Sequence, residues 1–222
     1  MKPDLICYDF DGTLCDTMPD ISESINVTLK EMGYGQISIE KVRSFVGNGI
    51  AKLISRSLAF SIAQETGREM DMEEIERFGK KMKAHYFDHM TDNSDLYEGV
   101  PDVLEHFKES AQIVISNKPV KMLHFLLKHY KIDHYFDLVV GGDSIDVCKP
   151  DLKVWDYVKT EMKLDGDVNA VMVGDSKPDV EFGLAAGMKT IAVTFGYNDI
   201  DKLKDAGAKN LADKFIDLID LM

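Results

Sequence analysis

Two aspartates near the N-terminus have a spacing that suits catalysis. Asp9 and Asp11 flank Phe10 and are followed by Gly12 and Thr13. Because side chains two residues apart on an extended chain point the same way, both carboxylates should face one site. Gly12 allows a tight turn that brings backbone N–H groups close to an anion. Taken alone, the segment is equally compatible with an acidic turn between a strand and a helix.

Further polar residues follow other short apolar runs of the chain. Ser116 and Asn117 offer a hydroxyl and an amide as donors to phosphate oxygens. Lys149 follows a third run, and Asp175 and Asp179 follow a fourth. Each feature is a weak signal by itself, but their shared position in this order is hard to explain by chance.

The charges in this set indicate which chemistry it could perform. Four aspartates close together would repel one another and any phosphate, by about 4 kcal/mol per pair at 4 Å and an effective dielectric of 20. Magnesium, which prefers oxygen ligands, would remove that repulsion, and Lys149 would add fixed positive charge. The expected chemistry is phosphoryl transfer, in which an attacking carboxylate divides hydrolysis into two easier steps.

Short apolar runs predict the strands that would position these residues. The runs comprise residues 5–8, 112–115, 138–140, 170–173 and 190–194. Such runs are typical of strands that are buried on both faces of a parallel sheet. Helical patterns occupy residues 100–109, 119–130, 151–163 and 177–186. The alternation predicts an α/β fold, a doubly wound, Rossmann-like parallel sheet that binds ligands beyond the carboxyl ends of its strands.

Residues 17–91 interrupt this alternation and contain only helical patterns. These patterns cover residues 18–32, 38–46, 49–66 and 72–90, and Ser38 provides a plausible N-terminal cap for the second. We therefore predict a small α-helical cap domain over residues 17–91. It is inserted into an α/β core formed by residues 1–16 and 92–222.

Composition narrows the possible environments and partners. The 222 residues are 45% hydrophobic and 29% charged, which is typical of a soluble globular protein. We expect a cytoplasmic protein, because no secretory signal or membrane-spanning stretch is evident and the three cysteines show no pairing pattern. The net charge of −13 argues against nucleic acids and anionic membranes as partners. The expected partner is a small phosphorylated metabolite, and the expected assembly is a monomer or homodimer.

The four motifs together resemble those of the haloacid dehalogenase superfamily of phosphatases. They are DFDGT from Asp9, Ser116, Lys149-Pro150 and GDSKPD from Gly174, and with the helical insertion they span nearly the whole chain. The resemblance implies that Asp9 is the nucleophile. It implies that Asp11 protonates the leaving group and then activates water.

The resemblance also implies a binding role for most of the other motif residues. Mg²⁺ would be held by Asp9, the backbone carbonyl of Asp11 and Asp175, while Asp179 would support the waters on the metal. The phosphate would be held by Gly12, Ser116, Asn117 and Lys149.

Further short segments of the sequence resemble those of the phosphoglycolate phosphatases of this superfamily. They include VGNG at residues 46–49 and TFGYN at residues 194–198, and they imply 2-phosphoglycolate as the substrate. Asn48, Lys52 and Arg56 are then candidates for contacting the leaving group from the cap. The alternative is that the glycines merely end one helix and begin another, and that the two basic residues are solvated.

Other activities of the same core remain open at this point. A pyrophosphatase or a broad sugar- or nucleotide-phosphate phosphatase would share these motifs and differ in the cap. A phosphomutase of the β-phosphoglucomutase kind is a further alternative, although such relatives often carry Glu-Asp where this chain has Gly174-Asp175. A dehalogenase is disfavoured because Asp11 is characteristic of phosphoryl transfer.

Overall fold

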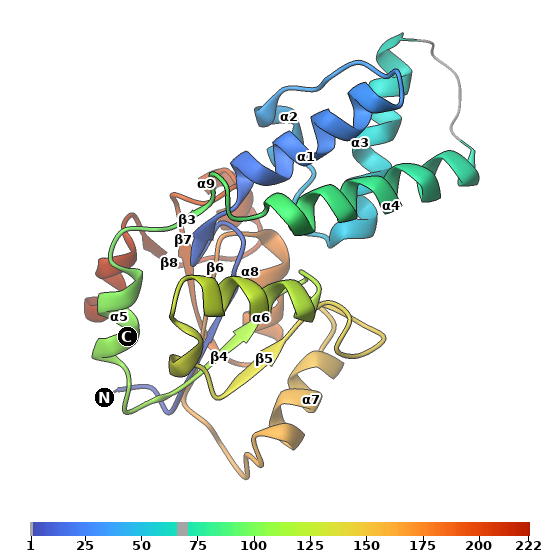
Figure 1. Ribbon diagram of the computed structural model, residues 1–222. Coiled ribbons are helices and arrows are strands. Elements are labelled where there is room, and N and C mark those ends of the chain that lie inside the picture. The colour runs from blue at the N-terminus through green and yellow to red at the C-terminus, as the bar shows by residue number, and fades with distance from the viewer. Residues whose placement is uncertain (1, 66–70) are drawn as a thin grey trace. The chain divides into compact units, whose positions relative to one another are not determined.

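The computed structural model describes residues 2–65 and 71–222, which form two compact units (Figure 1). The first unit comprises Met1–Asp16 and Leu96–Met222, and the second comprises Thr17–Asp95. The sequence places the return to the core at residue 92, whereas the second unit extends through Asp95. Among the described helices, none combines the length and apolar character needed to cross a bilayer.

The first unit is built on a parallel sheet of six strands. These are β1 (Leu5–Tyr8), β4 (Ala111–Ile115), β5 (Leu138–Val140), β6 (Ala170–Gly174), β7 (Lys189–Val193) and β8 (Asn210–Ala212). Their spatial order is β5-β4-β1-β6-β7-β8, so the strands lie third, second, first, fourth, fifth and sixth in chain order. This order is that of a doubly wound sheet, in which ligands bind at the switch point between the first and fourth strands. The predicted α/β fold is confirmed.

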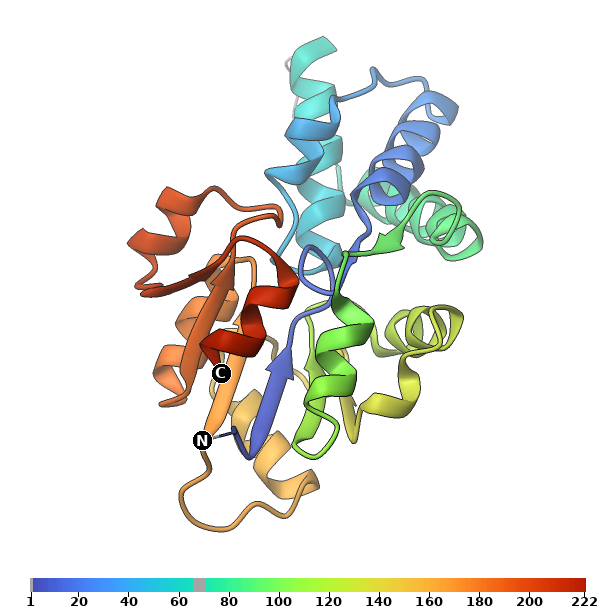
Figure 2. The ribbon, with the colours of Figure 1, turned by 90° about the vertical axis from the view of Figure 1, so that its left-hand side faces the viewer.

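Helices cover both faces of this sheet. They are α5 (Val100–His106), α6 (Val120–His129), α7 (Lys153–Glu161), α8 (Lys177–Ala185), α9 (Ile200–Asp205) and α10 (Leu218–Leu221), with 3₁₀ turns η1 (Asp133–Tyr135) and η2 (Phe215–Asp217). On one face, Leu5 and Cys7 of β1 belong to a core cluster with Val158 of α7 and Phe182 of α8. Figure 2 shows α5 and the C-terminal helix α10 on the opposite side of β1.

Successive side chains of a strand point to opposite faces of the sheet, so an unbroken apolar run makes both faces apolar. All four residues of β1 are buried, and Tyr8, which points away from Cys7, stacks its ring on Phe215 of η2 with centroids 6.1 Å apart. A strand enclosed on both faces needs an unbroken apolar sequence, which is why the runs were recognisable in the sequence.

Strand register brings the ends of the central strands into one row. Tyr8 is paired with Val114 of β4 and with Val173 of β6. The residues that follow these three positions therefore leave the sheet at the same edge. Asp9, Ser116 and Asp175 come within two residues of them, so the row is set by backbone pairing.

The C-terminal elements were not predicted from the sequence. β8 is a short edge strand whose first residue, Asn210, is polar and donates from its side chain to the Thr190 carbonyl at 2.9 Å. One face of an edge strand can be solvated, so it lacks the continuous apolar run of the central strands. Helices α9 and α10 are too short for an apolar stripe to repeat.

The second unit is helical, as predicted. It contains α1 (Met18–Glu31), α2 (Ile39–Arg43), α3 (Ile50–Glu65) and α4 (Met72–His89), and α4 packs against both α1 and α3. Residue 66, the predicted end of the third helix, lies outside the described residues. The short strands β2 (Cys15–Asp16) and β3 (Asp95–Leu96) form a separate two-stranded sheet.

Two polar contacts explain local features of this helical unit. The hydroxyl of Ser38 accepts from the Lys41 N–H at 3.3 Å, which confirms the predicted cap of α2. Buried Asp20 accepts backbone N–H bonds from Asn93 and Ser94, both at 2.9 Å, and a hydroxyl bond from Ser94 at 2.6 Å. These bonds fix the segment after α4 against the start of α1.

Candidate active site

Three buried carboxylates gather at the carboxyl ends of β1 and β6. One oxygen from each of Asp9, Asp175 and Asp179 lies within 4.8 Å of the others. Asp9 is anchored directly to the sheet, because its N–H donates to the Val173 carbonyl at 2.9 Å. The sequence predicted this convergence, and the structure places all three at the switch point of the sheet.

Lys149 lies among these carboxylates and is buried. Its Nζ is 3.1 Å from Asp9 Oδ1 and 2.5 Å from Asp179 Oδ1. Burial opposes the charge on this ammonium, but the two carboxylates outweigh it and raise the pKa of Lys149. The raised pKa keeps Lys149 protonated beside Asp9 at neutral pH.

Crowding of like charges perturbs the acids themselves. Burial, followed by the charge of Asp179, raises the pKa of Asp9 to about 6, although Lys149 and the Ser116 hydroxyl act in the opposite direction. Burial and the charges of Asp179 and Asp9 also raise the pKa of Asp175 well above its ordinary value. Without a further cation, the site favours protons on these carboxylates.

Asp175 is held by the two loops on either side of it. Its Oδ2 accepts the Tyr197 N–H at 2.7 Å, and its Oδ1 accepts the Thr13 hydroxyl at 3.3 Å. Two glycines let these loops approach closely. A Cβ on Gly12 would lie 2.5 Å from Asp175 Oδ2, and a Cβ on Gly196 would lie 2.2 Å from Asp175 Cβ. Asp175 is thus enclosed by backbone that tolerates no added atom.

Asp179 has both oxygens engaged at the beginning of α8. Oδ2 accepts the N–H of Ser176 at 3.0 Å and its hydroxyl at 2.5 Å, while Oδ1 accepts from Lys149. Asp179 therefore caps its own helix and also orients the lysine that faces Asp9. The role that the resemblance implied for Asp179, supporting the waters on the metal, stays a prediction.

The carboxylate of Asp11 lies outside the group of three. Its Oδ1 accepts from Nζ of Lys118 at 2.8 Å, and the lysine side chain is only 4% exposed. The sequence led us to expect that the carboxylates of Asp9 and Asp11 face one site. In the structure each is paired with its own buried lysine, Asp9 with Lys149 and Asp11 with Lys118. Lys118 was not among the predicted site residues, although it directly follows Ser116 and Asn117.

Three residues predicted to hold phosphate have specific local contacts. The hydroxyl of Ser116 accepts from the Lys118 N–H at 3.3 Å, and Asn117 donates from Nδ2 to the Lys149 carbonyl at 3.1 Å. Gly12, at φ +82°, donates its N–H to the Cys15 carbonyl at 2.8 Å. That N–H is therefore engaged within the turn, and Gly12 also allows a close approach to Asp175. Phosphate binding by Gly12 stays a prediction.

The cap candidates belong to the helical unit. Arg56 of α3 donates to Asn48 Oδ1 at 3.0 Å and to the Phe45 carbonyl at 3.3 Å. Both Arg56 and Lys52 are exposed. Arg56 thus holds the Gly-Asn-Gly loop within its own unit, which is a structural role in addition to any contact with substrate.

The donor set fits a hard divalent cation. Asp9, Asp11, Asp175 and Asp179 carry four negative charges when ionised, and Lys118 and Lys149 supply two positive ones, so two negative charges are left. Among the described residues, Asp9 Oδ1 has an ion pair but no hydrogen bond of good geometry, although it is fully enclosed. Carboxylate oxygens are the ligands that Mg²⁺ prefers.

Comparison with known proteins places these motifs in a family. The model of the haloacid dehalogenase-like hydrolases matches residues 6–193, a range that includes Asp9, Asp11, Ser116, Lys149, Asp175 and Asp179. The chain belongs to the haloacid dehalogenase-like hydrolase family.

Relatives of this hydrolase include several phosphatases. It is 31% identical to the phosphoglycolate phosphatase of Aliivibrio fischeri, over 95% of this chain and 92% of the relative. It is 34% identical to phosphoglycolate phosphatase 1 of Pseudomonas aeruginosa, over 98% of this chain and 79% of the relative. The crystal structure of a predicted phosphoglycolate phosphatase from Haemophilus somnus superposes with a TM-score of 0.91 at 29% identity, and covers 98% of this chain and 97% of that one. The hydrolase is thus a phosphatase, a phosphoric monoester hydrolase.

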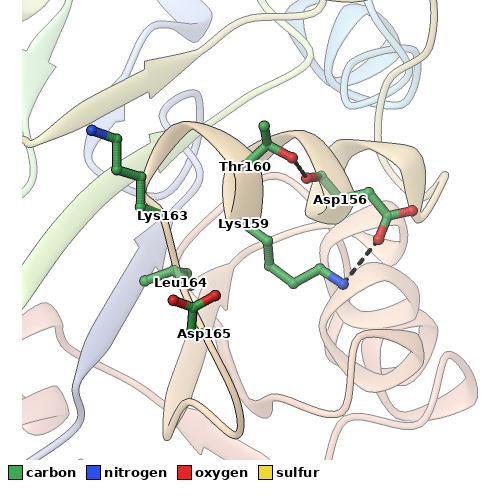
Figure 3. Close-up of a pocket in the computed structure, with 6 residues that line it drawn as sticks. All are labelled: Asp156, Lys159, Thr160, Lys163, Leu164 and Asp165. Carbon is green, nitrogen blue, oxygen red and sulfur yellow. Dashed lines mark hydrogen bonds and ion pairs between the residues drawn. The ribbon is translucent and has the colours of Figure 1, made fainter.

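A surface hollow of the hydrolase lies at the C-terminal end of α7, away from Asp9, Asp175 and Asp179 (Figure 3). Its lining comprises Asp156, Lys159, Thr160, Lys163, Leu164 and Asp165. Asp156 is paired there with Lys159 at 2.9 Å, and the Thr160 hydroxyl donates to the Asp156 carbonyl. This segment leads into the amino end of β6, whereas Asp9 follows the carboxyl end of β1. The hollow therefore lies near the amino ends of the strands and Asp9 near their carboxyl ends. It provides a matched position for control variants.

Sequence reasoning missed the residues that support the hydrolase motifs. Lys118, Thr13, Gly196 and Tyr197 contact Asp11 or Asp175, but none was assigned a role. Thr13 belongs to DFDGT, Gly196 and Tyr197 belong to TFGYN, and Lys118 directly follows the predicted site residues Ser116 and Asn117. The available signal was their proximity to motif residues, whereas their contacts depend on loops that only the fold brings together.

Proposed function

We propose that the protein is a magnesium-dependent phosphatase that hydrolyses 2-phosphoglycolate through an aspartyl-phosphate intermediate. The observation that carries this proposal is the buried group of Asp9, Asp175 and Asp179, with Lys149 paired to Asp9. The names of the relatives from Aliivibrio fischeri and Pseudomonas aeruginosa support the choice of substrate.

In the first step, a carboxylate oxygen of Asp9 forms a bond to phosphorus while the bond from phosphorus to the ester oxygen breaks. Asp11 donates a proton to that departing oxygen, so that glycolate leaves as an alcohol. Lys149 and the Ser116 hydroxyl stabilise the charge that develops on the phosphoryl oxygens.

In the second step, water attacks the phosphorus of the aspartyl phosphate. Asp11, now deprotonated, accepts a proton from this water, and the bond between phosphorus and Asp9 breaks. Inorganic phosphate and the free carboxylate of Asp9 result, and the site has returned to its starting state.

Asp9, the backbone carbonyl of Asp11 and Asp175 would hold Mg²⁺, and Asp179 would support its waters. The bound ion supplies positive charge that lets an anionic substrate approach an acidic site. Tyr197 and Thr13 keep the Asp175 carboxylate in place for this purpose.

The helical cap is the part of the chain that would select the leaving group. Asn48, Lys52 and Arg56 remain the candidates for this selection. The substrate is a small phosphorylated metabolite, and we place its hydrolysis in the cytoplasm.

The proposal is tested by phosphate release from 2-phosphoglycolate, pyrophosphate, a hexose phosphate, a β-hexose 1-phosphate and a nucleotide, with and without Mg²⁺. We expect a magnesium-dependent preference for 2-phosphoglycolate that falls at least about a thousandfold in Asp9→Asn. The matched control is Asp156→Asn, which makes the same change in the surface hollow and should retain wild-type rates.

The outcomes distinguish the remaining activities. Preference for pyrophosphate, a hexose phosphate or a nucleotide would replace the substrate but keep the mechanism. Conversion of the β-hexose 1-phosphate to its isomer without phosphate release would identify a mutase. Full activity in Asp9→Asn would refute the mechanism.

A further inference from the structure

Lys118 is a buried cation that the motif-based mechanism does not use. Among residues 2–65 and 71–222, Lys118 and Lys149 are the two buried lysines. Lys149 is engaged by Asp9 and Asp179, whereas Lys118 lies 2.8 Å from Asp11 Oδ1. The two lysines therefore serve different carboxylates, and only one of these belongs to the group around the nucleophile.

The backbone of Lys118 is fixed on both sides. Its N–H donates to the Ser116 hydroxyl at 3.3 Å, and its carbonyl accepts from the Gly142 N–H at 2.9 Å. Gly142 is packed so tightly that a Cβ there would lie 2.4 Å from the Asn117 carbonyl oxygen. An ammonium on such a support is preorganised, and preorganised charges are effective in recognition.

The position of Lys118 relative to Asp11 indicates which part of a substrate it can reach. In the proposed mechanism Asp11 contacts the ester oxygen of the leaving group. In 2-phosphoglycolate the carboxylate carbon lies two single bonds beyond that oxygen, a span of about 2.5 Å. A cation 2.8 Å from the Asp11 carboxylate is therefore within reach of the substrate carboxylate.

We propose that Lys118 is the specificity-determining residue that binds the carboxylate of the leaving group. This inference rests on the proposed function, because it requires a substrate with a carboxylate beside the ester oxygen. It adds a residue of the α/β core to the cap residues Asn48, Lys52 and Arg56 that the sequence had indicated.

The chemistry of the ammonium allows this second contact. Lysine has three N–H donors, so Lys118 can hold Asp11 and a substrate carboxylate at the same time. Its side chain is 4% exposed and that of Asp11 is 15% exposed, so water would compete little with a substrate carboxylate for contact with this ammonium. Sites with buried polar groups reject analogues that cannot pair with them, by factors of about 10⁴ in the best cases.

The test compares two esters that differ only in the group that Lys118 would bind. Ethyl phosphate has the ester oxygen and the first carbon of 2-phosphoglycolate, with a methyl group in place of the carboxylate. We expect wild-type enzyme to prefer 2-phosphoglycolate in kcat/KM, and Lys118→Met to reduce this preference about 100-fold. We also expect glycolate, the product, to inhibit the variant less than the wild type.

If Lys118 only positioned Asp11 and did not contact the substrate, the result would be different. Both esters would then lose the same factor in Lys118→Met, and the preference would survive, which would overturn the inference. Lys128→Met, an exposed lysine on α6, is the control for losing a positive charge. Lys118→Arg and thermal unfolding of each variant distinguish loss of recognition from loss of folding.

Failure of the proposed function would be read from the wild type. A wild-type enzyme with no preference for 2-phosphoglycolate over ethyl phosphate would remove the proposed substrate, and this inference with it. A wild-type preference that persists in Lys118→Met would remove the inference alone.

Discussion

Substitution of Gly196 by alanine should damage the active site through a single methyl group. Gly196 lies in the loop after β7, beside Asp175. An added Cβ would be 2.2 Å from Asp175 Cβ and 2.5 Å from the Gly12 carbonyl oxygen, whereas ordinary contacts begin at 3.4 Å. The difference between 3.4 and 2.2 Å requires a shift of at least about 1.2 Å. Neither neighbouring atom is the end of a flexible side chain, so backbone must move.

The expected loss follows from the size of this shift. A displacement of about 1 Å in catalytic geometry can reduce activity by 10²-fold, which corresponds to about 2.7 kcal/mol in activation free energy. Overpacking should also lower the free energy of unfolding by about 1–3 kcal/mol. We therefore expect kcat/KM to fall about 100-fold in Gly196→Ala, together with a higher Mg²⁺ concentration for half-maximal activity.

The assay is phosphate release from 2-phosphoglycolate across a Mg²⁺ titration, with thermal unfolding measured in parallel. Gly166→Ala is the control, because Gly166 has φ +76° but nothing within 4 Å of the position that an added Cβ would take. It should lose stability through backbone strain and keep its activity. If Gly196→Ala kept kcat/KM within about threefold of wild type at every Mg²⁺ concentration, the steric reasoning about Asp175 would be refuted.

Two further predictions concern charge at the same site. The pKa of Asp9 is raised from its ordinary 3.8 to about 6 in the metal-free folded protein. The folded protein therefore holds the proton on the Asp9 carboxyl more tightly than the unfolded chain does. The contribution of Asp9 to the free energy of unfolding should fall by roughly 3 kcal/mol as the pH rises from 3.8 to about 6. Thermal unfolding without Mg²⁺ should therefore show Asp9→Asn to be more stable than wild type at pH 7.5, with the gap closing toward pH 4; a gap that is absent or reversed at pH 7.5 would contradict the assigned cause. Mg²⁺ at 100 times its dissociation constant should stabilise the wild type by about 2.7 kcal/mol, which raises the unfolding midpoint by about 5–10 °C. Asp175→Asn should show a smaller rise and Asp156→Asn the full rise, and an equal rise in all three proteins would exclude Asp175 as a ligand.

The sequence was informative where one physical requirement dominates. β1, β4 and β6 are enclosed on both faces, so their apolar runs could be recognised without knowledge of their neighbours. The carboxyl ends of parallel strands share an edge of the sheet, so the convergence of Asp9 with Asp175 followed from the fold class.

Contacts between loops could not be predicted in the same way. The Tyr197 N–H reaches Asp175 across 22 residues of chain, and Lys118 reaches Asp11 across 107. No local pattern encodes such a contact, because it depends on how closely glycines let two loops approach. β8 was missed for a related reason, since this short edge strand begins with polar Asn210 and shows no continuous apolar run.

The central position of β1 also constrains how the protein is made. β1 leaves the ribosome before the other strands of its sheet, yet Leu5 pairs with Ala111 on one side and with Ala170 on the other. The strand that carries the nucleophile therefore has no partner until about half of the chain has been synthesised, and it lacks its second partner until β6 follows. Contacts of such long sequence separation form slowly. Nascent chains that contain β4 but end before β6 would expose one open edge of an apolar strand, which favours association with other chains. Catalytic competence should consequently arise in one late step, when β6 closes against β1 and delivers Asp175 to Asp9.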